Sequence, residues 1–173
     1  MTPTSRNSSR KKHLKQTEGG GRNEWQQRLV KVFRKTLIIS NGQKNEPADT
    51  LALTCKNGSI FEMENELGKF KKITSCDYKL LWNLFSAYMI VYLLKQISQG
   101  QENKQSLEKA NEIARLGVKV FPSAYRFKLA KFLTEKLLTP SKQTSQQWWQ
   151  LREPTWLTPE EKELETVKRI VIY

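Results

Sequence analysis

The sequence predicts a mainly α-helical protein: a bundle of about five helices with a small β-hairpin and a disordered basic N-terminal tail. Three observations lead to this class. Apolar residues recur at helical spacing along several stretches, one Asn-Gly dipeptide separates two β-capable runs, and the first residues contain almost nothing apolar. The 173 residues suffice for one domain. We divide them into a tail over 1–22, a core domain over 23–140, and a tryptophan-rich linker with a C-terminal helix over 141–173.

The composition favours a polyanionic partner. The net charge of +13 comes from 30 Lys and Arg residues against 17 Asp and Glu residues. Enzyme chemistry is disfavoured, because the chain has one histidine, His13, and two cysteines, Cys55 and Cys76, that lie 21 residues apart. Phosphate-loop, dinucleotide, nucleophile-elbow and zinc-protease motifs are absent from the sequence. We therefore expect no catalysis, no metal, no cofactor and no small-molecule substrate.

The tail over 1–22 consists mainly of Ser, Thr, Gly and basic residues. Such a stretch buries too little apolar surface to offset its conformational entropy, so we expect it to be disordered when free. Up to Lys35, ten basic residues face two acidic ones, a local net charge of +8. The basic residues of the tail itself are Arg6, Arg10, Lys11, Lys12, Lys15 and Arg22.

A helix is predicted from Asn23, because Trp25, Leu29, Val32 and Phe33 repeat at the spacing of one helical face. The remaining surface carries Arg28, Lys31, Arg34 and Lys35. A basic amphipathic helix is typical of binding to nucleic acid, to a membrane surface or to the groove of a partner. The alternative is an ordinary helix whose apolar face joins the core and whose basic face is merely solvated.

The dipeptide Asn57-Gly58 separates Leu51–Cys55 from Ser59–Met63. Two β-capable runs around Asn-Gly predict a β-hairpin over 51–63, closed by a type I′ turn. The alternative is an irregular surface loop. The acids of the following stretch alternate, as on one face of a strand, and we expect them to be solvated rather than metal ligands; they are Glu62, Glu64 and Glu66.

Three further helices are predicted between residues 74 and 139. The first, capped by Thr74 or Ser75, runs through Ile97 and is apolar nearly all round, so it is the expected centre of the core. Its apolar run of fifteen residues is about 22 Å long, too short for a membrane span. A second helix over 103–116 is closed by Gly117, and a third begins near Pro122 and ends at Thr139-Pro140.

A second basic region covers residues 118–142, where six basic residues face one acid, a net charge of +5. The residues that we assign to nucleic acid here are Lys119, Arg126, Lys128 and Lys131. Lysine and arginine would contact phosphates and make binding salt-dependent and blind to base sequence. Tyr125 and Phe127 interleave with these charges. They are either core residues or platforms on which bases stack.

The last third of the chain contains Trp148, Trp149 and Trp156. These tryptophans either pack back onto the domain or dock to another subunit, since buried tryptophans are favoured interface anchors. We assign them to partner binding. A helix start follows at Thr158, with Pro159 at the first position and acids in the first turn.

Residues 76–138 contain an apolar helix, CDYKLLWNLFSAYMIVYLL, and a basic one, FPSAYRFKLAKFLTEKLL. In size, charge and helix content this third of the chain resembles the small helical subunits of multi-subunit CRISPR effector complexes. The resemblance implies a non-catalytic subunit that holds nucleic acid through lysines and arginines. It concerns architecture and gives no residue-by-residue correspondence. The chain is equally similar to ribosome-associated proteins with basic extensions.

From the placement of charge we expect a non-catalytic subunit of a ribonucleoprotein that contacts the backbone of RNA or single-stranded DNA and other protein subunits. Two free cysteines and no apolar leader lead us to expect a cytoplasmic protein. The first alternative is a sequence-specific DNA-binding regulator acting as a homodimer. The second is a helical adaptor that binds an acidic protein or a membrane surface through residues 23–38.

Overall fold

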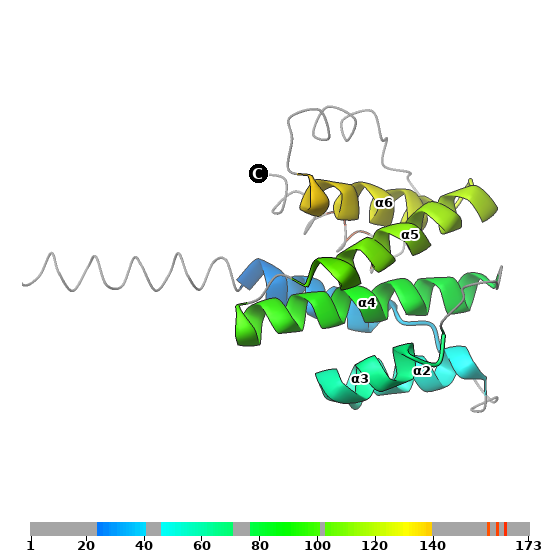
Figure 1. Ribbon diagram of the computed structural model, residues 1–173. Helices are drawn as coiled ribbons and strands as arrows, with labels where there is room; N and C mark the ends of the chain where they lie inside the picture. Colours follow the sequence, from blue (N-terminus) through cyan, green and yellow to red (C-terminus); the bar gives the residue numbers. More distant parts are fainter. Residues whose placement is uncertain are drawn as a thin grey trace, which may run out of the picture.

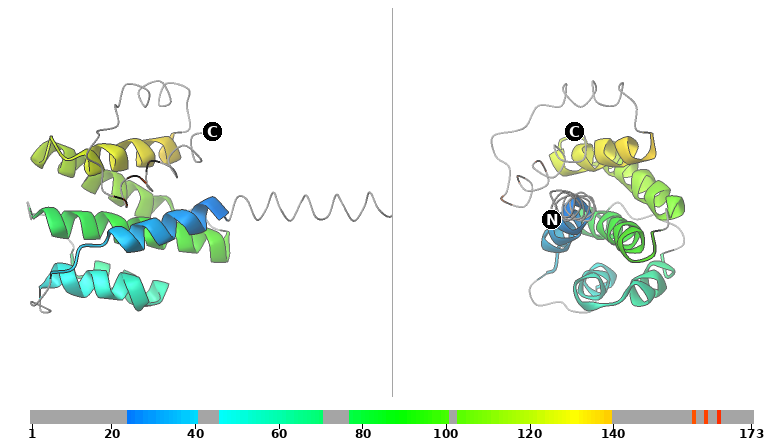
Figure 2. Two further views of the ribbon diagram at one scale, coloured as in Figure 1. Left: turned by 180° about the vertical axis from the view of Figure 1, so that it is seen from behind. Right: turned by 90° about the vertical axis from the view of Figure 1, so that its left-hand side faces the viewer.

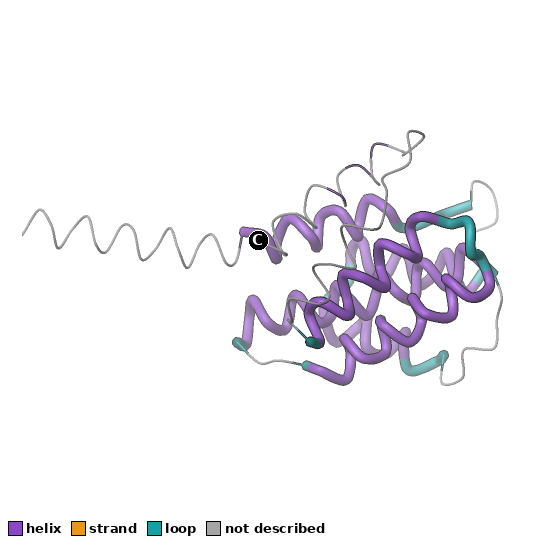
Figure 3. Tube along the Cα trace, turned by 90° about the horizontal axis from the view of Figure 1, so that it is seen from above, coloured by secondary structure: helices purple, strands orange, loops and turns teal. Residues whose placement is uncertain are grey.

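The structure, a computed structural model, describes residues 24–40, 46–70, 77–100 and 103–139, together with Pro159, Lys162 and Glu165. A helix over 24–36, called the N-terminal helix below, precedes five labelled helices. These are α2 (Pro47–Asn57), α3 (Ile60–Leu67), α4 (Tyr78–Gln99), α5 (Lys104–Val120) and α6 (Tyr125–Leu138). The described residues contain no strand (Figure 3). The predicted mainly α class is confirmed, and the predicted tail over 1–22 lies outside the described residues.

Helix α4 forms the centre of the bundle (Figure 1). Seen end-on, the N-terminal helix lies on one side of α4 and α5 on the other, with the α2–α3 pair beneath and α6 above (Figure 2). Helix α5 packs against both α4 and α6, while α2 and α3 pack against α4 and against each other. The core of the described chain therefore runs along α4.

The sequence of α4 explains its central place. Twelve of its residues are buried, on every side of the helix, so apolar neighbours can pack all around it. Within the described chain, α4 is the one helix whose length and hydropathy would allow a membrane span, and 67% of its most apolar window is buried in the bundle. Its N-cap is Asp77, whose carboxylate accepts from the Leu80 N–H at 3.3 Å, and not the predicted Thr74 or Ser75. Gly100 ends it in the left-handed conformation, with φ of 63°.

The N-terminal helix runs antiparallel to α4, because its first turn lies beside the last turns of α4 and its end lies beside Asn83. Gln26 Nε2 donates to Gln96 Oε1 at 2.6 Å. Near the middle, the Phe33 ring packs against the rings of Trp82 and Phe85, with centroids 6.5 and 5.6 Å away. The apolar face of this helix is therefore part of the core, as one of the two alternatives for residues 23–38 proposed.

A buried polar network holds the segment that follows the N-terminal helix. Asn83 is fully buried; its amide accepts from the Ile38 N–H at 2.8 Å and donates to the Ile38 and Ala48 carbonyls at 2.8 and 3.0 Å. Asp49 accepts from the Ser40 N–H at 3.0 Å, and Lys79 lies 3.3 Å from the same carboxylate. Hydrogen bonding to Glu46, and then to Asp49, raises the pKa of Lys79 above its usual value. Residues 37–40 are thus fixed to α2 and α4 by side chains.

The predicted β-hairpin over 51–63 is wrong, because Asn57-Gly58 joins two helices instead. Gly58 has φ of −90°, which does not fit the positive φ of a type I′ turn. The Ser59 hydroxyl accepts from the Glu62 N–H at 3.2 Å and donates to the Glu62 carboxylate at 3.3 Å, so Ser59 caps α3. Glu62, Glu64 and Glu66 therefore belong to a helix, where a spacing of two residues does not place side chains on one face.

Gly117 does not close α5 as predicted; it lies inside the helix, three residues before the end. A Cβ at this position would come within 2.2 Å of the Phe127 ring, so only glycine lets α6 approach α5 this closely. Pro122 lies in the turn between the helices, and α6 begins later, after Ala124. The glycine that the sequence suggested as a helix stop is a packing position.

Candidate nucleic-acid interface

The N-terminal helix presents one row of cations to solvent. Arg28, Lys31 and Lys35 are exposed, whereas Leu29, on the opposite face, is fully buried. The three cations are spaced i, i+3 and i+7 and therefore follow one side of the helix over about 10 Å. We call these three residues the basic row. Because the other face of the helix is part of the core, the row has a fixed orientation.

Two cations of the basic row, Arg28 and Lys31, have few acidic neighbours. Glu24 is the only acid among residues 24–36. Within the described part of the chain, neither Arg28 nor Lys31 forms an ion pair. Charges on a surface that already lacks counter-charges are the ones that gain most from a bound polyanion.

Arg34 belongs to the same helix but not to the row. Its side chain is half-buried, and Nε donates to the Cys55 carbonyl of α2 at 3.2 Å. The Cys55 thiol is buried in this contact, and burial raises its pKa to about 12. Such a thiol is inert at neutral pH. Arg34 joins the N-terminal helix to α2 and is placed for stability.

Arg126 of α6 is placed in a similar way. Its guanidinium stacks over the Trp82 ring, 4.9 Å from the centroid, and Nη1 donates to the Thr36 carbonyl at 3.5 Å. Both contacts lie where α6 meets the end of the N-terminal helix. Its neighbours Tyr125 and Phe127 are buried, so they belong to the core and not to a stacking surface. This aromatic–cation cluster serves the fold.

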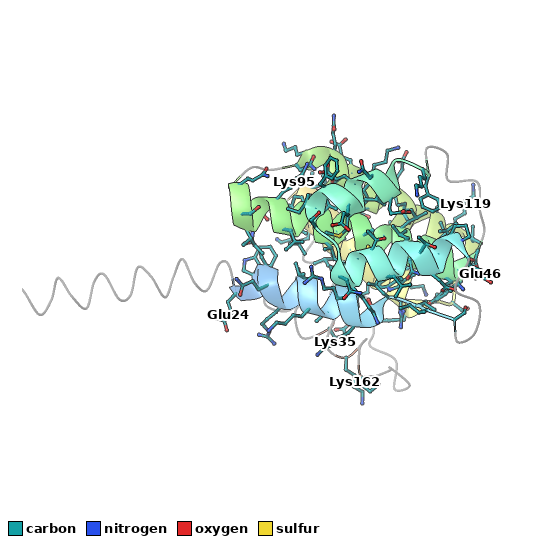
Figure 4. The ribbon with its side chains drawn as sticks, turned by 90° about the horizontal axis from the view of Figure 1, so that it is seen from below. Glu24, Lys35, Glu46, Lys95, Lys119 and Lys162 are labelled. Atoms are coloured by element: carbon teal, nitrogen blue, oxygen red, sulfur yellow. The ribbon has the colours of Figure 1, made fainter. Side chains whose placement is uncertain are left out.

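The other cations of the second basic region do not form one surface with the basic row. Lys128 and Lys131 are half-buried, and Lys131 lies 3.9 Å from Glu135 on the next turn. Lys119 is exposed, but it lies on another side of the bundle from Lys35 (Figure 4). The structure therefore separates the residues that the charge count had grouped together.

One exposed cation was missed by the sequence analysis. Lys162 is exposed, and in the view of Figure 4 it projects from the same side of the molecule as Lys35. In the sequence it stands between Glu161 and Glu163, within a stretch that reads as acidic.

A cleft of about 750 Å³ lies on another side, between α3, α4 and α5. Its two lysines each pair with an acid: Lys95 lies 2.9 Å from Glu64, and Lys109 lies 3.4 Å from Glu112. Glu108 also lines the cleft, so its lining carries more acids than lysines. Burial raises the pKa of Tyr88 in its wall, so the phenol keeps its proton at neutral pH. The cleft does not extend the basic surface.

The remaining predicted site residues lie outside the described residues. They are Arg6, Arg10, Lys11, Lys12, Lys15 and Arg22 of the tail, and the tryptophans Trp148, Trp149 and Trp156. Their assignment to nucleic acid and to a protein partner stays a prediction. The tail directly precedes the helix that carries the basic row, which connects the two in the chain.

The chain was compared with protein-family models, with curated proteins and with solved structures. None of the three comparisons finds a match. The resemblance to small CRISPR effector subunits therefore stays a prediction, and the function has to be argued from the basic row and its surroundings.

Proposed function

We propose that the protein is a non-catalytic subunit of a ribonucleoprotein that contacts the phosphate backbone of RNA or single-stranded DNA through the basic row. The observation that carries the proposal is the exposure of Arg28, Lys31 and Lys35 on one side of a helix whose other side is locked into the core. Because the backbone that carries the row is already ordered, binding a phosphate chain costs side-chain entropy but no further backbone entropy in this helix. The six cations of the tail lie immediately before it in the sequence and add charge.

The proposal favours backbone contacts over base reading. Among the described residues, the large apolar side chains that are exposed are Leu53 and Phe61, and both belong to the α2–α3 pair. The basic row itself combines charge with polar neighbours, which suits phosphates and carries little information on base sequence. The adaptor alternative loses its apolar contact surface, because Val32 is buried in the core, and an acidic protein would then have to bind the same exposed cations.

The test is binding of fluorescein-labelled oligouridine and oligothymidine to the full chain at rising salt. The variant combines Arg28→Gln, Lys31→Gln and Lys35→Gln. We expect the slope of log K against log salt to fall by about 2 to 3, and affinity at physiological salt to fall about 100-fold. A chain that binds neither probe, or binds them independently of salt, would contradict the proposal.

A matched control lies on α5, across α4 from the row (Figure 2). Lys104, Arg115 and Lys119 are exposed and have the same composition of two lysines and one arginine. Replacing these three by glutamine changes the net charge equally. If this control weakens binding as much as the basic-row variant, affinity follows net charge alone and the basic row is not the interface.

A further inference from the structure

Trp25, in the first turn of the N-terminal helix, is an aromatic residue at the edge of the core. Its side chain is half-buried and packs against the core on one side. The ring-to-ring contacts of the described chain join core rings such as those of Phe33 and Trp82, and none of them involves Trp25. Its indole Nε1 forms no hydrogen bond within the described chain and is not buried, so this edge of the ring faces water. Part of the indole is therefore open to a ligand.

The first turn of the N-terminal helix is fixed on the bundle, which gives Trp25 a defined position. The next residue, Gln26, is 2% exposed and donates to Gln96 of α4 at 2.6 Å. Leu29, one turn after Trp25, is fully buried. The indole is thus held against the core before any ligand binds, and such preorganisation lowers the entropy cost of a contact.

Trp25 borders the basic row. Arg28 follows it by three residues, a spacing at which the Cβ atoms of a helix lie about 5–6 Å apart. At about 100° per residue, the exposed Arg28 lies about 60° from Trp25 on one side, and the buried Leu29 about 40° on the other. Within the described chain, the cation that stacks on an aromatic ring is Arg126 and not Arg28. An open aromatic surface and an exposed cation therefore lie side by side.

We propose that Trp25 stacks on a base of a single-stranded nucleic acid whose neighbouring phosphates contact Arg28 and Lys31. The inference rests on the proposed function and narrows its ligand, because the strand has to offer an unpaired base. In a duplex the bases stack on one another, whereas a single strand can turn a base out onto an aromatic side chain. Every base has a π face, so the contact adds affinity without selecting a sequence.

The first experiment compares two probes with the same number of phosphates, oligothymidine and a chain of abasic deoxyribose phosphates. Trp25→Leu keeps an apolar contact with the core but removes the aromatic face. We expect it to weaken oligothymidine binding about five- to tenfold and to change binding of the abasic chain by less than about twofold. Arg28→Gln removes a phosphate contact and should weaken binding of both probes by a similar factor.

The two probes separate this inference from the proposed function. Equal loss on both probes in Trp25→Leu, or wild-type affinity for both, would overturn the inference. The proposed function still stands in either case if the combined Arg28→Gln, Lys31→Gln and Lys35→Gln variant binds both probes more weakly. Wild-type affinity for both probes in that combined variant contradicts the proposed function.

Two further variants separate stacking from packing. Trp25→Phe also shortens the side chain but keeps a ring, so we expect oligothymidine affinity within about threefold of the wild type. Equal losses in Trp25→Phe and Trp25→Leu would overturn the inference, and melting by circular dichroism shows whether the two variants are equally folded. Phe61→Leu is the control for aromatic exposure, because Phe61 is 72% exposed on α3. A loss of oligothymidine affinity in Phe61→Leu as large as in Trp25→Leu would place the stacking away from the basic row and overturn the inference.

The last experiment replaces the single strand by a duplex of the same length. Because paired bases are not open to Trp25, we expect Trp25→Leu to weaken binding of the single strand and to change duplex binding by less than about twofold. A loss on the duplex as large as on the single strand would overturn the inference.

Discussion

The N-terminal helix and α6 each carry four basic residues, yet they present their charge in opposite ways. Three of the four cations of the N-terminal helix are exposed, whereas every residue of α6 is buried or half-buried. Arg126 of α6 stacks on the Trp82 ring instead of facing solvent. The difference shows that the number of cations in a segment does not determine how many of them a ligand can reach.

The cause lies in how the cations are distributed around each helix. With about 100° between successive residues, Arg28, Lys31 and Lys35 fall within about 60° of one another. The α6 cations are spread around the whole helix, so any packing of α6 turns some of them inward; they are Arg126, Lys128, Lys131 and Lys136. The N-terminal helix can therefore bury one face without removing these three cations from water. Helix α6 cannot bury any face without partly burying some of its cations.

The largest effect is expected from a substitution that detaches the N-terminal helix from the core, because the orientation of the basic row depends on that packing. Phe33 is 1% exposed and packs against both Trp82 and Phe85, so Phe33→Ala should lower the free energy of unfolding by about 3–5 kcal/mol. Urea denaturation followed by circular dichroism measures this. A loss below about 1 kcal/mol would mean that the helix is not anchored as described and that the row has no fixed orientation.

The seating of α6 depends on Gly117. Gly117→Ala would place a methyl group within 2.2 Å of the Phe127 ring, and we expect a loss of about 1–3 kcal/mol in the free energy of unfolding. Gly68→Ala is the matched control, because its nearest contact at 3.4 Å is an ordinary one and the change should be within about 0.5 kcal/mol. Equal effects at both glycines would contradict close packing of α6 on α5.

Within α6, the comparison predicts that two neighbouring cations differ. Arg126→Met removes the contact with Trp82 and the bond to Thr36, and should cost about 1–2 kcal/mol of folding free energy. Lys128→Met should cost less than about 0.5 kcal/mol. Thermal melts of the two variants, recorded under the same conditions, measure this difference in stability. An Arg126→Met protein that is more stable than the wild type would show that the guanidinium does not stabilise the fold.

The smallest effect is expected where the charges are most exposed. Arg28→Gln and Lys31→Gln should each change the free energy of unfolding by no more than about 0.5 kcal/mol, because neither side chain has a partner among the described residues. These substitutions then lower nucleic-acid affinity while leaving the melting curve unchanged. A large loss of stability in either variant would assign the basic row to the fold.

Helical spacing predicted the N-terminal helix, α4, α5 and α6, since the buried residues of each recur at the expected intervals. Asn57-Gly58 misled because the same dipeptide occurs both in hairpin turns and in breaks between helices. The local signal that favours the helix break is the Ser-x-x-Glu sequence from Ser59 to Glu62, which is typical of a helix start. Gly117 and Arg126 were misassigned for another reason. Their roles are set by Phe127 and Trp82, contacts that only the packed helices create.

Asn83, the fully buried amide of α4, has a consequence for how the N-terminal helix is held in rotation. Apolar side chains would let a helix turn or slide against α4 with little change in buried area. Asn83 removes that freedom, because its hydrogen bonds to both Ile38 backbone groups and to Ala48 are met at one setting only. A rotation by one residue would break two of them and sweep the cations through about 100°. The hydrogen bonds of Asn83 therefore fix the rotation of the N-terminal helix about its axis, and with it the direction in which the basic row faces.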